Sequence, residues 1–308
     1  MAHQITSKDS VAYAGAVPWH GIGKQVSDLM TSSEAIMQGG LGWQVIQLPI
    51  FDQAGVRIEG YKGIYREDTK ELLQIAGKGY TPIQNDRCFS VFDEIVGSGQ
   101  AKYEVVGSLQ GGRKIWILAR IPSLDFAVKG KDEVRSYLLL TSSHDGSLSL
   151  QVFETPIRVV CHNTLSAALC GKEKGKVAYF KHTVNYSGRI GIAQGILEKS
   201  ISYFQQFKAA SEELARQQMN SLEMSSFLDS LLNLDGIAKD DVSTRAGNQK
   251  LELERLFVDG MGNGQEGIRG TKWAAYNAVT EYVDHTRSTK GDDSNRLASS
   301  WYGSGSLL

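Results

Sequence analysis

The residues best suited to chemistry in this sequence are cations and aromatic rings that alternate within one short stretch. The stretch comprises Lys172, Lys174, Lys176, Tyr179, Phe180 and Lys181. Ammonium groups neutralise phosphates, and the faces of aromatic rings stack on bases without reading their identity. This combination predicts contact with single-stranded nucleic acid. The competing interpretation is a solvated loop, which is the usual role of lysine-rich turns.

Two further pairs of residues extend the predicted nucleic-acid surface. Arg113 and Lys114 follow the turn-forming triplet Gln110-Gly111-Gly112, where they could line a groove. Lys272 and Trp273 open an aromatic-rich run near the end of the chain, and Trp273 could stack on a base. No recognised signature such as a helix-turn-helix accompanies these residues.

Four residues are assigned a structural or ligand-contact role. Trp19 and His20 lie in a glycine-containing segment, where a tight turn could bring them close to backbone or ligand. Asn163 follows Cys161-His162, and Asn277 lies inside or beside the aromatic face of the predicted C-terminal helix. A buried asparagine needs several hydrogen-bond partners, so it commonly fixes a register or holds a ligand.

The clustered soft ligands Cys161, His162, Cys170 and His182 suggest zinc or a cysteine nucleophile. They lack a Cys-x-x-Cys or His-Glu-x-x-His frame, and a nucleophile would need a base and an orienting group close by in space. Reduced core thiols are therefore the favoured interpretation. We assign no catalytic residue, no metal and no cofactor.

The formal net charge of -1 conceals two segments of opposite sign. Residues 101–190 contain thirteen bases and seven acids, a net charge of +6, and residues 212–259 contain five bases and ten acids, a net charge of -5. Such asymmetry can attract an anionic partner, or it can draw neighbouring subunits together. Two solvated faces of different sign explain it equally well.

The predicted strands share alternating apolar residues or a flanking turn signal. They span 45–51, 56–65, 72–75, 102–109, 113–121, 135–142, 148–154 and 157–161. The glycine triplet at 110–112 and the Asp145-Gly146 dipeptide each predict a hairpin.

The predicted helices are recognised by apolar side chains at three-and-four spacing. They span 32–37, 86–96, 162–169, 190–214, 224–234, 244–258 and 272–286. The glycines between 260 and 270 predict a flexible loop before the last of them.

These patterns predict an α+β fold, in which an antiparallel sheet of hairpins with interleaved helices is followed by a helical C-terminal part. We expect an N-terminal arm at 1–42, a sheet core at 43–187 and helices at 188–308 that pack on the core. The chain is long enough to bury a sizeable core without disulfides. No apolar run approaches the roughly 20 residues of a membrane span, so a cytoplasmic protein without membrane contact is expected.

Several motifs together resemble a family of phage, prophage and plasmid proteins called phage/plasmid-like protein, which carries the label domain of unknown function 932. The motifs are Pro18–Gly23, Tyr80–Asn85, Arg158–Leu165, Gly270–His285 and Trp301–Gly305. The resemblance implies a mobile-element setting, and it implies no active site.

The order hairpin, hairpin, strand, helix from 102 to 169 also looks like the core of phage single-strand-annealing proteins of the RecT, Erf and Redβ type. Those proteins grip DNA in a groove and assemble into rings, and the comparison is fold-level analogy. We therefore hypothesise a non-enzymatic, oligomeric protein that binds and anneals single-stranded DNA. The alternative is a host-takeover or anti-defence protein that binds a host protein or nucleotide.

Overall fold

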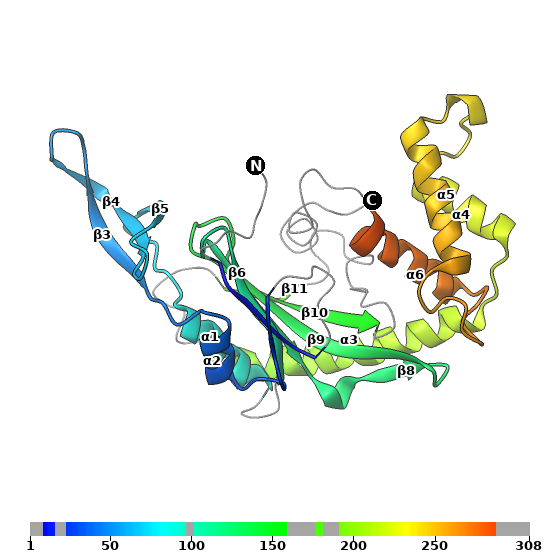
Figure 1. Ribbon diagram of the computed structural model, residues 1–308, viewed down its shortest axis with the longest axis horizontal. Coiled ribbons are helices and arrows are strands. Elements are labelled where there is room, and N and C mark those ends of the chain that lie inside the picture. Colours follow the sequence, from blue (N-terminus) through cyan, green and yellow to red (C-terminus); the bar gives the residue numbers. More distant parts are fainter. Residues whose placement is uncertain (1–8, 16–22, 97–101, 159–175, 181–190, 288–308) are drawn as a thin grey trace. The chain divides into compact units, whose positions relative to one another are not determined.

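The computed structural model describes residues 9–15, 23–96, 102–158, 176–180 and 191–287 (Figure 1). Within them, two sheets and six α-helices form a mixed architecture, and most of the helical residues follow the strands in the sequence. This confirms the predicted α+β class.

The larger sheet has eight strands. In spatial order they are β11 (Lys176–Phe180), β10 (Leu150–Arg158), β9 (Asp132–Ser143), β7 (Lys114–Arg120), β6 (Lys102–Leu109), β1 (Val11–Ala14) and β2 (Lys24–Val26), and β8 (Phe126–Val128) pairs with β9. Six of the eight strands, β6 to β11, come from the basic segment 101–190. The basic part of the sequence therefore builds most of this sheet.

Both predicted hairpins are confirmed. Strands β6 and β7 are antiparallel, and Gln110, Gly111 and Gly112 in the turn all have positive φ, as two adjacent glycines allow. Strands β9 and β10 are neighbours, and Gly146 between them has φ +73°.

The first 42 residues differ from the predicted arm. Strand β1 lies inside the sheet, antiparallel to β6 and parallel to β2, and all four of its residues are buried. Thr31 then caps α1 (Ser32–Gln38) in a reciprocal capping box with Glu34. A four-residue apolar run carries too little periodicity to be recognised as a strand, and burial in a sheet formed with distant residues decides its structure.

The smaller sheet has the order β3-β4-β5 and is antiparallel throughout. Its strands are β3 (Val45–Phe51), β4 (Arg57–Arg66) and β5 (Leu72–Gly77), which agree closely with the three predicted strands. Figure 1 shows β3 and β4 as a long twisted hairpin with β5 beside it.

The described helices also agree with the apolar periodicity of the sequence, and the predicted helix 162–169 lies outside the described residues. They are α2 (Asn85–Val96), α3 (Gly191–Arg216), α4 (Ser221–Leu231), α5 (Thr244–Asp259) and α6 (Lys272–Glu281), the last continued by a π-helical turn, η5 (Tyr282–Thr286). Short 3₁₀ turns lie at η1 (Pro122–Leu124) and η4 (Lys239–Asp241). Among the residues described, no helix combines the length and the apolar character needed to cross a membrane.

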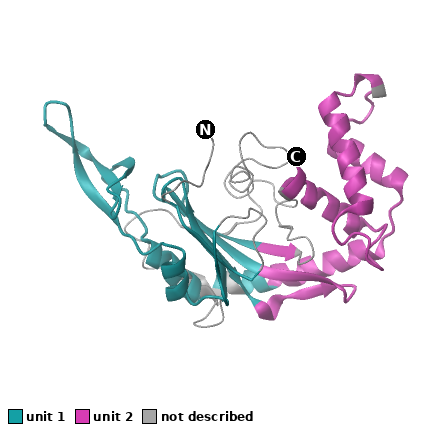
Figure 2. Cartoon of the chain, viewed as in Figure 1, with its two compact units in different colours: residues 1–121, 137–154, 176–201 teal, residues 122–136, 155–175, 202–308 magenta. Residues whose placement is uncertain are grey.

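The chain forms two compact units, each assembled from separate segments of sequence (Figure 2). Unit 1 contains 1–121, 137–154 and 176–201, and unit 2 contains 122–136, 155–175 and 202–308. Strands β9 and β10 and helix α3 contribute residues to both units. The units therefore do not coincide with the predicted ranges 1–42, 43–187 and 188–308.

Unit 2 has its own hydrophobic core around α6. Phe207, Leu228, Leu253, Ile268 and Trp273 are among its buried residues. Trp273 stacks on Tyr276 at 5.4 Å between ring centroids, and Phe207 meets Trp273 edge-on. Helix α6 is buried on nearly every side, so it is a central core helix, whereas the sequence predicted one apolar and one polar face.

Candidate functional site

The predicted lysine and aromatic stretch is described only where it forms β11. Lys176, Tyr179 and Phe180 belong to this strand, which pairs antiparallel with β10. Lys172, Lys174, Lys181, Trp19, His20 and Asn163 lie outside the described residues, as do Cys161, His162, Cys170 and His182.

Strand β11 is the last strand of the eight-stranded sheet among those described. Its backbone register pairs Gln151 with Tyr179 and Leu150 with Phe180. A strand at the edge of a sheet is accessible along its outer side, where its backbone groups can meet another molecule. The lysine-rich segment of the sequence is thus attached to a sheet edge.

Arg113 is held within the fold by backbone carbonyls. Its guanidinium donates to the carbonyl oxygens of Leu72 and Leu73 on β5, the Leu72 contact at 3.0 Å. The turn beside it is closed by Asp9, whose carboxylate accepts hydrogen bonds from the amides of Gly111 and Gly112 at 2.9 and 3.0 Å. Consecutive backbone amides of this kind bind anions, and here the anion is the protein's own carboxylate. Arg113 and this turn therefore hold unit 1 together, whereas the sequence suggested that they line a groove.

Lys272 and Trp273 have opposite environments. Lys272 is exposed, and its ammonium donates to the side-chain oxygen of Gln217 at 2.6 Å. Trp273 is fully buried and its indole nitrogen donates to Asp132 at 2.7 Å. A base cannot reach the Trp273 ring in this position, so the expectation that Trp273 stacks on nucleic acid is corrected. The spacing placed Trp273 on a helix but could not show that α6 is covered on its other sides.

Asn277 is buried one turn beyond Trp273, and its side-chain nitrogen donates to the Trp273 carbonyl at 2.9 Å. Two residues that the sequence did not single out hold the glycine-rich loop against the same helix. Glu281 is buried and accepts from the Met261 amide, and Asn263 donates to the carbonyls of Leu256 and Ala274. The first residues of the loop are therefore anchored, although its glycines suggested flexibility.

Unit 1 contains a buried polar cluster that the sequence also did not indicate. The Asn85 side-chain nitrogen donates to the carbonyls of Leu41 and Trp43, so its oxygen is the acceptor facing His144 Nε2 at 2.9 Å. His144 Nε2 must therefore carry the proton. Trp43 meets the His144 ring edge-on at 5.3 Å. The arrangement joins the start of α2 to the β9–β10 turn.

Arg66 lies beside this cluster, with its guanidinium 4.5 Å from the centre of the Trp43 ring. It donates through two nitrogens to Asp68, which lowers the pKa of that carboxyl, and through a third to the Gly111 carbonyl. Planar guanidinium groups suit this combination of ion pair and ring stacking. The arginine thus links the β4–β5 and β6–β7 turns.

Cys88 lies one helical turn after Asn85 and is also buried. Burial raises the pKa of its thiol to about 12. A thiol that stays protonated at neutral pH is a poor nucleophile, so the burial of Cys88 favours a core role.

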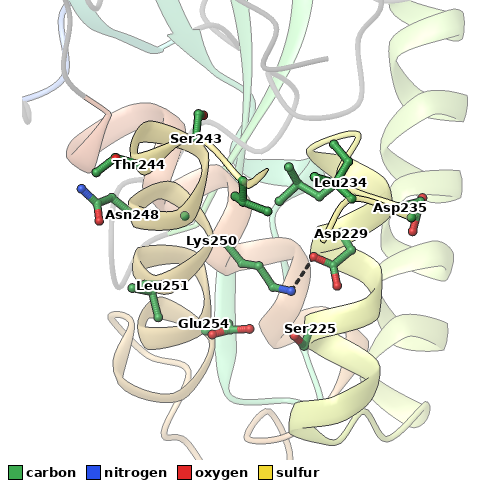
Figure 3. A pocket seen from close by; sticks show the side chains of 14 residues that line it. Ser225, Asp229, Leu234, Asp235, Ser243, Thr244, Asn248, Lys250, Leu251 and Glu254 are labelled. Atoms are coloured by element: carbon green, nitrogen blue, oxygen red, sulfur yellow. Dashed lines mark hydrogen bonds and ion pairs between the residues drawn. The ribbon is translucent and has the colours of Figure 1, made fainter. Parts of the chain in front are cut away.

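A pocket of about 710 Å³ opens between α4 and α5 in unit 2 (Figure 3). Lys250 reaches from α5 to Asp229 on α4, and Glu254 lies farther along α5 (Figure 3). The pocket lining contains three acidic residues, Asp229, Asp235 and Glu254, and one basic residue, Lys250. This excess of negative charge repels a polyanion, so the pocket does not extend the predicted nucleic-acid surface.

No set of three metal-ligating side chains gathers within the part of the chain that the structure describes. The polar contacts found there join the protein's own elements, as in the Asn85, Arg66 and Asp9 clusters. The fold and these sites define an α+β protein whose described polar clusters are structural.

The chain belongs to the family described as Domain of unknown function (DUF932), whose family model matches residues 72–301. The matched region includes three of the motifs noted in the sequence, Tyr80–Asn85, Arg158–Leu165 and Gly270–His285. Comparisons with curated proteins and with solved structures give no match to this chain.

Proposed function

We propose that this chain binds single-stranded nucleic acid along the β11 edge of the eight-stranded sheet and acts as an oligomer that anneals or protects strands. The observation that carries the proposal is the position of β11 as the last of the described strands of its sheet, within a sequence stretch that contains Lys172, Lys174, Lys176 and Lys181. A polyanion can approach such an edge, and the lysines supply the charge that it needs.

The charge distribution supports the same role. The segment that builds β6 to β11 carries a net charge of +6, and the acidic segment 212–259 lies on and around α4 and α5 in unit 2. Long-range attraction therefore favours a polyanion at the sheet over one at the α4–α5 pocket. Opposite charges on the two segments also allow neighbouring subunits to attract one another.

The biological setting that we propose is the host-cell cytoplasm during the life of a phage or plasmid, where transient single strands need annealing. The hairpin order of the sheet, shared with phage annealing proteins at the level of sequence pattern, is consistent with this setting. The proposal requires no metal, cofactor or covalent step.

Fluorescence polarisation with a labelled oligonucleotide tests the proposal. Binding should be tight at low salt and should weaken linearly as the logarithm of the salt concentration rises. A single strand should also bind more tightly than the matching duplex, because ring stacking needs unpaired bases.

Two results would overturn the proposal. One is the absence of binding at low salt, and the other is affinity that does not change with salt. Copurification of a host protein at fixed stoichiometry, with no nucleic acid in the absorbance spectrum, would favour the host-takeover alternative.

A further inference from the structure

The three-stranded sheet β3-β4-β5 belongs to unit 1, and one of its two faces packs against the rest of that unit. In the strand register, Val45 lies opposite Arg66, Gln47 opposite Ile64, and Lys62 opposite Ala76. Directly opposed residues share a face, so these rows lie on the same side of the sheet. Val45, Ile64 and Ala76 are buried there. This inner face explains why the sheet is held to the rest of the unit.

The outer face consists of the alternating rows and is also apolar. Ile46 pairs with Tyr65, and Leu48 with Gly63, and both rows continue into β5 at Leu72 and Ile75. Tyr61, opposite Gly77, extends the face. The exposed fractions are 43% for Leu48, 55% for Tyr61, 38% for Leu72 and 55% for Ile75. A sheet with one solvated face normally alternates apolar with polar residues, and this sheet does not.

Gly63 lies at the centre of the outer face, where the ring of Tyr65 covers it. A Cβ atom at this position would lie 2.4 Å from Tyr65 Cε2, so the tyrosine ring must rest over the glycine. The ring fills the gap that a glycine leaves in a strand, and it adds a rigid aromatic surface. Tyrosines of this kind make strong interface anchors because they lose little conformational entropy when they bind.

No charged residue lies in these outer rows. Around them, residues 45–80 contain five basic and five acidic side chains, so the whole sheet is electrically neutral. A neutral surface offers a polyanion no electrostatic attraction, so we do not expect nucleic acid to bind here as it is proposed to bind at the β11 edge. An apolar partner gains the most, because burial of apolar surface needs no charge to be desolvated.

We propose that the outer face of the β3-β4-β5 sheet binds the same face of a second copy of this chain. In a two-fold interface the same patch meets itself, and side chains near the axis face their own copies. Like charges there would repel, and the rows of the outer face described above have none. The proposal gives the subunit contact for the oligomer in the proposed function, and it rests on that part of it.

Packing between the two copies should be face to face. Pro49 lies in the middle of edge strand β3 and has no amide hydrogen, so pairing of β3 with another strand would lack a bond. Stacked sheets lie about 10 Å apart with their side chains interdigitated. Leu48, Tyr65 and Ile75 would then form the buried centre, with Tyr61 toward the rim.

The size of the face predicts a modest affinity. Three strands spaced about 4.8 Å apart, and about six residues long, cover on the order of 300 Å² in projection. Stable interfaces bury roughly 800 Å² on each partner, so this contact is smaller than a stable interface and falls in the range of weak, transient contacts. We therefore expect a weak dimer that dissociates on dilution.

Sedimentation velocity of the full-length chain without nucleic acid tests this inference. The wild-type chain should shift from monomer to dimer as its concentration increases. Leu48→Glu and Ile75→Glu should each remain monomeric at the highest concentration, because two copies would bury carboxylates against one another. Both side chains are exposed, so circular dichroism spectra and melting temperatures should stay near those of the wild type.

Leu222→Glu is the matched control. Leu222 is 83% exposed on α4 in unit 2, so the same change of charge occurs away from the outer face, and dimerisation should persist. A wild-type chain that stays monomeric at every concentration would refute the inference, and so would dimerisation that survives both substitutions on the face. Oligonucleotide titrations of the same variants report separately on the β11 edge, so a failure of strand binding leaves the dimer result intact.

Discussion

The indole nitrogen of Trp273 donates a 2.7 Å hydrogen bond to a carboxylate oxygen of Asp132, a residue 141 positions earlier in the chain. Both residues are buried. Trp273 belongs to α6 and Asp132 begins β9, so the bond ties the central helix of unit 2 to a strand end in the same unit. A hydrogen bond between two buried side chains is costly to lose, because burial keeps solvent from replacing the lost partner.

Trp273→Phe should therefore lower the free energy of unfolding by about 1–3 kcal/mol, the usual cost of leaving a buried polar group without its partner. Urea denaturation followed by circular dichroism measures the change. Lys272→Ala, at the exposed neighbouring position, should stay within about 0.5 kcal/mol of the wild type.

The same Trp273→Phe variant should bind a labelled single strand as the wild type does, when measured well below its melting temperature. An unchanged stability together with clearly weaker strand binding would restore the stacking role that the burial of Trp273 argues against.

The lysines in and next to β11 in the sequence should set the salt dependence of strand binding. Each phosphate contact on a single strand contributes about 0.7 to the slope of log affinity against log salt, so replacing Lys172, Lys174, Lys176 and Lys181 by glutamine should reduce the slope by up to about 3. Polarisation titrations over a range of salt concentrations give the slope.

A charge-matched control replaces the exposed lysines Lys24, Lys70, Lys78 and Lys208 by glutamine. It changes the net charge equally, so it should leave the slope nearly unchanged. Equal losses in the two quadruple variants would mean that net charge, and not the β11 edge, drives binding.

Glu154 should make stability depend on pH. It lies on β10 with Ser200 Oγ 3.4 Å from its carboxylate, and burial raises its pKa from 4.5 to about 7. The folded state therefore holds a proton that the unfolded state releases between about pH 4.5 and 7. The contribution of Glu154 to the free energy of unfolding is therefore greatest below about pH 4.5. It falls as the pH rises from about 4.5 to about 7, and it no longer changes at higher pH.

Glu154→Gln removes this titration while keeping an oxygen that can accept from Ser200. It should be more stable than the wild type at about pH 8, and the difference should narrow as the pH falls toward 5. Thermal melts at several pH values measure it. A stability difference between the two proteins that stays constant with pH would show that folding does not shift the pKa of Glu154.

Gly112 should tolerate alanine poorly. It has φ +92°, and a Cβ atom there would lie 2.8 Å from the Trp43 ring and 3.2 Å from an Arg66 nitrogen. Backbone strain of about 1–2 kcal/mol and overpacking of about 1–3 kcal/mol should add in Gly112→Ala. Chemical denaturation gives the total.

Gly55→Ala separates the two contributions. Gly55 has φ +76° in the β3–β4 turn, but nothing lies within 4 Å of its added Cβ, so it reports backbone strain alone. If the two alanine variants lost the same stability, the contact between Gly112 and Trp43 would contribute nothing.

Local patterns in the sequence predicted most of the elements. Apolar residues at three-and-four spacing predicted α3 and α5 to within two residues, and they predicted the combined span of α6 and η5. Turn residues at 110–112 and 145–146 predicted both hairpins. These signals are local because a helix or hairpin is stabilised by residues close together in the chain. The predicted strand-binding residues on β11 remain a prediction.

The roles of individual side chains were less predictable. Arg113 resembles a phosphate ligand in the sequence, yet it donates to carbonyls of β5, forty residues away. Glu281 resembles a solvated helix residue, yet it is buried under the glycine-rich loop. In both cases the partner is a backbone group, which every sequence position offers equally, so no pattern could identify it.

The sequence by itself determined the α+β class, the two hairpins, the order of helices and the separation of basic from acidic segments, because each depends on near neighbours in the chain or on composition. Only the tertiary structure decided that Val11–Ala14 is an inner strand, that Trp273 is buried, and that the β3-β4-β5 sheet has a second face with exposed apolar side chains. Burial depends on which distant segments pack together. The sequence therefore does not show whether an apolar residue is buried in the core or exposed on the surface.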